Sequence, residues 1–125
     1  MRVFKSKKFA KFAEKEKISD TKLYEVANNM ASGKIDADLG GYVFKQRIAR
    51  EGRGKSGGYR VIILYRVESR LFFVHGFSKS DEDNITEEQE RDFKKLASFF
   101  LELPDKKLAE LVKLKELVEV TNDEN

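Results

Sequence analysis

Residues 59–77 read YRVIILYRVESRLFFVHGF and contain the longest uninterrupted apolar run of the chain, from Val61 to Tyr65. Because the centre of this run is apolar at every successive position, we predict a strand that lies inside a sheet and is covered on both faces. Residues 67–70 predict a turn, and the apolar segment 71–77 predicts the next strand. The two strands are therefore expected to form an antiparallel hairpin.

Helix boundaries are marked on both sides of this hairpin. Ser19 is a favourable N-cap, and Gly33 stands where a glycine commonly ends a helix. Thr86 and Gln89 have the spacing of a capping box, in which each side chain bonds a backbone N–H of the other residue. Pro104 is expected to stop the helix that begins there.

The whole pattern predicts an α+β domain with one small antiparallel sheet, N-terminal helices packed on it and two C-terminal helices. Residues 42–48 alternate, so Tyr42, Phe44, Gln46 and Ile48 are expected to share one side of a strand, mostly toward the core. The last helix is expected to be capped by Asp105. The predicted elements are a possible edge strand at 2–4, helices over 7–16 and 20–32, strands over 42–48, 59–65 and 71–77, a helix from Thr86 to Pro104, and a last helix reaching Val118.

Length and composition indicate a single domain spanning residues 1–125. No apolar run approaches the roughly 20 residues of a membrane span. The N-terminus returns repeatedly to lysine and does not build the apolar region of a secretory signal. We therefore expect a cytoplasmic protein without membrane association. The absence of cysteine excludes disulfides and thiolate metal sites.

Positive charge is concentrated in the middle of the chain. Residues 45–79 carry nine Lys or Arg and two Asp or Glu, whereas residues 80–125 carry seven and fourteen. A cluster of like charges repels itself, so it is more plausible as a site that an anionic partner completes than as a simple solvated loop. The sequence therefore predicts a polyanion-binding surface.

Two nucleotide-binding motifs are matched only by letters. Residues 52–57, GRGKSG, fit the G-x-G-x-x-G spacing and include the letters GKS of a phosphate-binding loop. A dinucleotide fingerprint must open a helix, but a strand follows here, and a Walker loop would need glycine in place of Ala49. We therefore reject both.

Metal and histidine chemistry receive little support. His75 is the only histidine, and one imidazole without a second ligand makes a weak metal site, so a structural role is the simpler interpretation. The acidic residues 81–84 lack the glycine and the ligand spacing of a calcium loop. We expect no metal and no cofactor.

Three segments together resemble the RelE-type toxins of bacterial type II toxin–antitoxin modules, in particular the HigB-like branch of the RelE/ParE superfamily. The segments are DADLGG at 36–41, VFKQRIAREGRGKSGGYRVIILYR at 43–66 and LFFVHGFSKSDEDNI at 71–85. The resemblance covers roughly residues 1–120. It implies a metal-independent endoribonuclease that cuts messenger RNA on the ribosome, and a cognate antitoxin, typically of the helix-turn-helix type, in a hetero-oligomeric complex.

The resemblance also implies roles for particular side chains. Arg47 and Arg60 are expected to hold the scissile phosphate, Lys55 to position or deprotonate the 2′-hydroxyl, and Lys79 to stabilise charge. The tyrosine that some relatives carry near the C-terminus has no counterpart, because Tyr65 is the last tyrosine of the chain. The wider set of expected RNA-binding residues comprises Lys45, Arg50, Arg53, Tyr59, Tyr65, Arg66 and His75.

Two alternatives remain open at this point. A toxin of the related ParE branch would share the fold but inhibit gyrase instead of cutting RNA. A non-catalytic nucleic-acid-binding module would use the same basic surface and show strongly salt-dependent binding without cleavage.

Overall fold

The computed structural model describes residues 1–50, 54–78 and 84–121, with the backbone alone for 54–57. The fold is α+β, with a six-stranded, mostly antiparallel sheet in the order β2-β3-β4-β5-β1-β6. The strands are β1 (Arg2–Ser6), β2 (Ala37–Gly40), β3 (Val43–Arg50), β4 (Gly54–Tyr65), β5 (Arg70–Ser78) and β6 (Leu117–Val120). The helices are α1 (Lys7–Glu16), α2 (Asp20–Ala31), α3 (Glu87–Phe100) and α4 (Asp105–Lys113).

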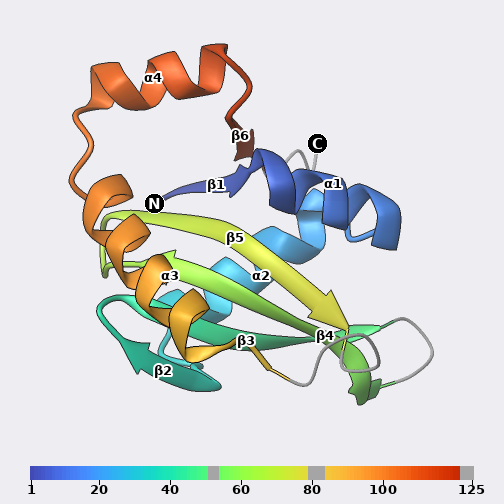
Figure 1. Ribbon diagram of the computed structural model, residues 1–125. Helices are drawn as coiled ribbons and strands as arrows, with labels where there is room; N and C mark the ends of the chain where they lie inside the picture. Colours follow the sequence, from blue (N-terminus) through green and yellow to red (C-terminus); the bar gives the residue numbers. More distant parts are fainter. Residues whose placement is uncertain (51–53, 79–83, 122–125) are drawn as a thin grey trace.

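The sheet separates two apolar layers, and Figure 1 shows α3 crossing one face with α2 behind the other. On β4, Val61 and Ile63 pack in the layer that includes residues of α1 and α2. The alternate residues Ile62 and Leu64 pack in the layer of α3 and α4. All four are fully buried, which confirms that this strand is central and covered on both faces.

The predicted starts of α2 and α3 are confirmed by their capping bonds. The Ser19 hydroxyl accepts a hydrogen bond of 3.1 Å from the backbone N–H of Lys22. In the capping box, the Thr86 hydroxyl accepts from the N–H of Gln89 at 3.1 Å, and the Gln89 side chain accepts from the N–H of Thr86 at 2.8 Å. The β4–β5 hairpin is antiparallel, as expected.

The first strand is not an edge strand, contrary to the sequence prediction. β1 lies between β5 and β6, parallel to β5 and antiparallel to β6. Val3 and Phe4 are consequently buried on opposite faces of the sheet. The parallel pairing joins residues about 70 positions apart, a contact that no local pattern encodes.

The segment from residue 37 to residue 46, at the β2 edge of the sheet, also differs from the prediction. Residues 37–40 form an additional edge strand, β2, which the sequence analysis did not identify. Tyr42 lies in the turn before β3 with a φ of 65°, and 52% of its surface is exposed, so it does not join the core. Gln46 is buried instead because its side-chain amide bonds the backbone of Lys34 and Asp36.

The C-terminal region folds as a helix followed by a strand, not as one long helix. α4 ends at Lys113, and Lys115 adopts a φ of 64°, which reverses the chain into β6. The spacing of the apolar residues near the end of the predicted helix also fits a short strand, and in β6 Leu117 and Val120 are buried. Asp105 makes no capping bond; its carboxylate accepts a 2.7 Å hydrogen bond from Arg70. Within the described ranges, no helix is both long and apolar enough to span a bilayer.

The pairing of β1 with β6 predicts a small pH-dependent stability effect. Arg2 donates two hydrogen bonds of 2.9 Å to the Glu119 carboxylate, and these bonds lower the pKa of that carboxyl from its ordinary value. A depressed pKa stabilises the folded state above the unfolded value of about 4.3, and this stabilisation disappears as pH falls through the folded pKa. Both side chains are partly exposed, at 51% and 34%.

Glu119→Gln is therefore expected to lower the free energy of unfolding by only about 0.5 kcal/mol at pH 7. The deficit relative to the wild type should shrink as the pH falls below about 4. Urea unfolding at pH 7 and pH 3 measures both values. Glu14→Gln, at an exposed position on α1, is the control; a deficit for Glu119→Gln that grows toward acid would contradict the assignment.

Candidate nucleic-acid site

Two of the predicted phosphate-binding residues lie directly opposite each other in the sheet. The antiparallel register of β3 and β4 pairs Arg47 with Arg60, so both side chains leave the same face at cross-strand distance. This register follows a bulge after Ile48, where Gly58 approaches the Ile48 carbonyl oxygen so closely that a β-carbon would clash with it. Glycine at position 58 therefore permits the close approach that precedes Arg60.

A second bulge brings His75 to this same face. The pairing of β4 with β5 shifts between Ile62 and Ile63, which leaves Val74 as an extra residue. Without the bulge, simple alternation from Phe73 would direct His75 toward α1 and α2. With it, the imidazole packs 5.7 Å from the ring of Phe93 on α3, beside Phe77, which pairs with Arg60.

The cations at this face are weakly neutralised. The Arg47 side chain is about half exposed, and its guanidinium comes only within 3.9 Å of the Asp36 carboxylate, which instead accepts a 2.7 Å hydrogen bond from the Arg47 backbone N–H. Lys45 donates a 3.1 Å hydrogen bond to the side-chain oxygen of Asn84. The Nη1 atom of Arg60 is buried and has no hydrogen-bond partner among the residues that the structure describes. A buried polar nitrogen without a partner is costly, and an anion bound between Arg47 and Arg60 would remove that cost.

The amino-acid sequence matches the model of one known protein family. The model of the RelE toxin of the RelE/RelB toxin–antitoxin system matches residues 1–120. The chain belongs to the RelE toxin family. It is therefore a toxin of a toxin–antitoxin system, and the family implies a cognate antitoxin as its partner. No significant match to a curated protein was found.

Other predicted site residues of this RelE-family toxin lie on the opposite face. Tyr59 is only 3% exposed and packs in the layer of α1 and α2, with the ring of Phe12 in edge contact at 5.6 Å. The Arg50 guanidinium lies 5.6 Å from the centre of the Tyr59 ring. Arg50 and Tyr59 therefore cannot meet the phosphate that Arg47 and Arg60 would hold.

Arg66 and Tyr65 lie at the far end of β4, about 20 Å from Arg60 at the rise of an extended strand. Arg66 donates to the Glu102 carboxylate at 2.6 Å and to the Leu101 carbonyl at 3.1 Å. Tyr65 is buried. The structure thus separates both residues from the arginine pair.

Several predicted residues fall outside the described part of the toxin. These are Arg53, Lys79, the side chain of Lys55 and the acidic residues 81–83. Among the residues that are described, no three His, Asp or Glu side chains gather where they could hold a metal ion.

Sequence reasoning missed the neighbours that shape the site. Phe77 and Phe93 flank His75, while Asp36 and Asn84 contact Arg47 and Lys45. Phe93 also packs against the core layer of α3 and α4. Its contact with His75 depends on how α3 crosses the sheet and on the bulge at Val74, neither of which leaves a local pattern.

Proposed function

We propose that this toxin is an endoribonuclease that cuts messenger RNA on the ribosome and so inhibits translation. The observation that carries the proposal is the Arg47–Arg60 pair on one sheet face of a RelE-family toxin, in which the buried Nη1 of Arg60 bonds none of the described residues. Other RelE-family toxins are generally endoribonucleases, which supports the same reaction class.

The chemistry fits paired arginines. In cleavage by the 2′-hydroxyl, that oxygen attacks the adjacent phosphorus, its proton leaves, and the bond to the 5′-oxygen breaks as this oxygen gains a proton. The intermediate phosphorane carries two negative charges. Arg47 and Arg60 would stabilise this charge because guanidinium groups bond phosphate oxygens in pairs and remain charged at all relevant pH values.

Further roles extend the proposal to neighbouring residues. We assign Lys55 to positioning or deprotonating the 2′-hydroxyl and Lys79 to charge stabilisation, because these are the roles that the resemblance to RelE-type toxins implies for them. Lys45 and His75 would line the path of the RNA beside them. The proposed setting is the cytoplasm, with an antitoxin of the helix-turn-helix type in a hetero-oligomeric complex.

Mapping the 5′ ends of messenger RNA after brief induction in bacteria tests the proposal. We expect growth arrest and new ends at fixed positions within codons, since cleavage on the ribosome follows the reading frame. Induction of a DNA-damage response without new RNA ends would instead indicate gyrase inhibition. RNA binding without new ends would indicate a non-catalytic module.

A further inference from the structure

A groove of about 800 Å³ lies between the α1–α2 turn and the adjoining ends of β3 and β4. Tyr59 lines it, whereas the next residue, Arg60, points to the other face of the sheet. The groove is therefore distinct from the arginine pair. β2 pairs with β3 only as far as Lys45, and the Asp36 carboxylate accepts the backbone N–H of Arg47, so among the described residues no strand pairs with the outer edge of β3 beyond Arg47. An extended strand could thus pass from one face to the other over the free edge of β3.

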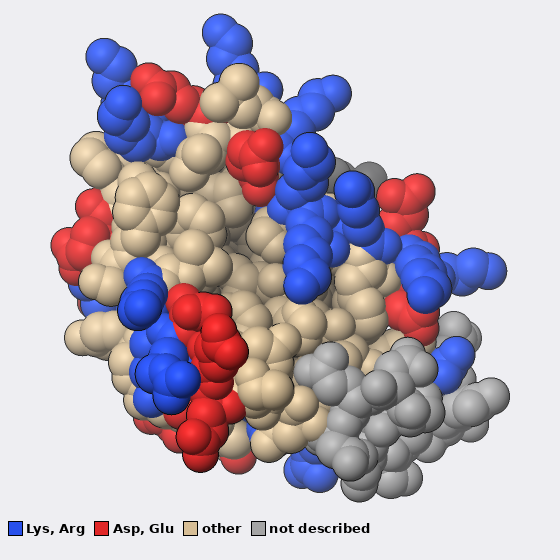
Figure 2. Space-filling view, in the orientation of Figure 1, with Lys and Arg blue, Asp and Glu red and all other residues tan. Residues whose placement is uncertain are grey.

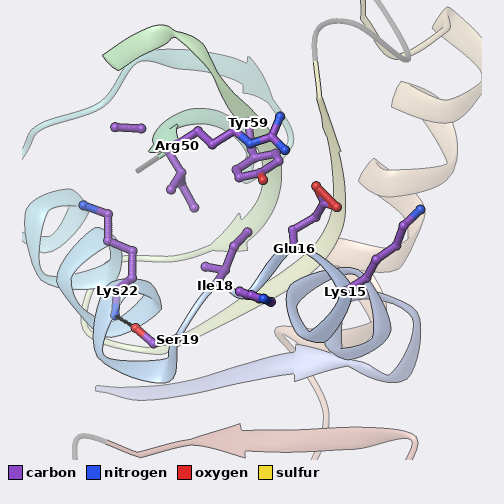
Figure 3. Close-up of a pocket in the computed structure, with 10 residues that line it drawn as sticks. Lys15, Glu16, Ile18, Ser19, Lys22, Arg50 and Tyr59 are labelled. Atoms are coloured by element: carbon purple, nitrogen blue, oxygen red, sulfur yellow. Dashed lines mark hydrogen bonds between the residues drawn. The ribbon is translucent and has the colours of Figure 1, made fainter. Parts of the chain in front are cut away.

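Cations dominate the lining of this groove. Lys15 comes from α1, Lys17 from the turn after it, Lys22 from α2 and Arg50 from β3, against one acidic residue, Glu16. Lys22 makes one exposed ion pair of 3.4 Å, with Glu25 outside the lining. In the described part of the chain, no ion pair engages Lys15, Lys17 or Arg50. Figure 2 shows further Lys and Arg side chains on the side where Figure 1 places α1.

The turn between α1 and α2, which carries Lys17 and connects the helices of Lys15 and Lys22, is held by backbone and capping hydrogen bonds. Lys17 ends α1 in the left-handed region with a φ of 58°. The N–H of Ile18 donates back to the Ala13 carbonyl at 2.8 Å, and the Ser19 hydroxyl caps α2 through the N–H of Lys22. Because the backbone of this turn is already fixed, a ligand that binds the three lysines need not order the backbone that positions them.

The sheet side of the groove presents a stacked arginine. Tyr59 is buried and fixed by Phe12, and the Arg50 guanidinium lies over its ring. A guanidinium held against an aromatic ring keeps its donors for phosphate oxygens and offers its other face to a nucleobase. Together with three lysines, this pair fits an RNA backbone better than it fits a compact, uncharged ligand.

We propose that the groove is a second RNA-binding subsite, which holds phosphates of an RNA strand on the face opposite Arg47 and Arg60. This inference rests on the proposed function, because it takes RNA as the ligand class. The phosphates would come either from the message, continuing over the edge of β3, or from ribosomal RNA. The subsite would provide affinity and orientation without touching the reacting atoms.

The test compares two triple variants of equal charge. One replaces Lys15, Lys17 and Lys22 with glutamine; the control replaces the exposed α4 residues Lys106, Lys107 and Lys113 with glutamine. Affinity is measured for a fully 2′-O-methylated 12-nucleotide RNA, which cannot be cleaved, and for small ribosomal subunits, over a range of salt concentrations. The slope of log K against log salt should fall by about 2 in the groove variant relative to the control, at about 0.7 per lost phosphate contact.

The pattern of loss identifies the source of the phosphates. Weaker binding of the free oligonucleotide indicates the message strand, and weaker binding of the subunit alone indicates ribosomal RNA; either result supports the subsite. A groove variant that matches the control in both measurements overturns it. Thermal unfolding of both variants checks that folding is unchanged.

Failure of the subsite and failure of the nuclease proposal give different results. If the wild type produces no new RNA ends but the groove variant still loses RNA affinity, the nuclease proposal fails and the subsite stands. If the wild type cuts message and the groove variant matches the control, the subsite is wrong and the nuclease proposal stands.

Discussion

Replacing Arg60 with alanine is expected to abolish growth arrest and to lower RNA cleavage by about 10²–10³-fold. This is the usual cost of removing one preorganised donor to a developing negative charge, about 3–4 kcal/mol. The reason is geometric, because Arg60 lies opposite Arg47 on one face of the sheet, so both side chains would face the scissile phosphate that we propose they hold. Growth after induction and the yield of new 5′ ends measure the loss.

The same substitution should not destabilise the fold. Arg60 Nη1 is buried and bonds no residue in the described part of the chain, so removing the guanidinium relieves the desolvation cost of that nitrogen and breaks no hydrogen bond from it to a described residue. We expect the urea midpoint of unfolding to stay the same or to rise. Arg91→Ala, which removes an exposed arginine from α3, is the matched control and should remain fully toxic. A fully toxic Arg60→Ala variant would show that the arginine pair does not hold the scissile phosphate.

Deleting residues 105–125 is expected to prevent folding, not merely to remove a surface for the antitoxin. The deleted segment includes Leu108, Leu117 and Val120, each at most 2% exposed. Losing a large buried aliphatic side chain costs roughly 2–5 kcal/mol, and the total stability of a domain is about 5–15 kcal/mol. The deletion also removes β6 and leaves β1 as an unprotected edge.

Circular dichroism and urea unfolding of the truncated chain, prepared in the Arg60→Ala background to limit toxicity, measure this effect. Deletion of residues 122–125 removes none of the three core residues and is the control. A truncated protein that still unfolds cooperatively but no longer binds its antitoxin would instead assign α4 and β6 to the antitoxin interface.

Helix starts and the central hairpin were predictable because their causes are local. The bonds between Thr86 and Gln89 join residues three positions apart, so the same four residues specify them in any context. The continuous apolar run at 61–65 likewise required a strand with both faces covered. These features indicated the α+β class, whereas the family resemblance rested on the segments at 36–41, 43–66 and 71–85.

The candidate site was predictable only in part. Arg47 and Arg60 were predicted together, and they are cross-strand neighbours, because the antiparallel register of β3 and β4 pairs them on one face. Arg66 shared the same alternation and was chosen for the same reason, yet it lies at the other end of β4 against Glu102. Alternation indicates the face of a sheet but not the position along it that forms a site.

By itself, the sequence determined the elements whose hydrogen bonds and apolar periods close within a few residues, together with the excess of positive charge in the middle of the chain. The tertiary structure decided which cations become neighbours. It inserted β1 between β5 and β6, turned His75 to the face of Arg60 through the bulge at Val74, and sent Arg50 to the opposite face. The physical reason is that strand register and bulges are set by packing between segments far apart in the chain, and a shift of one residue reverses the face of every side chain beyond it.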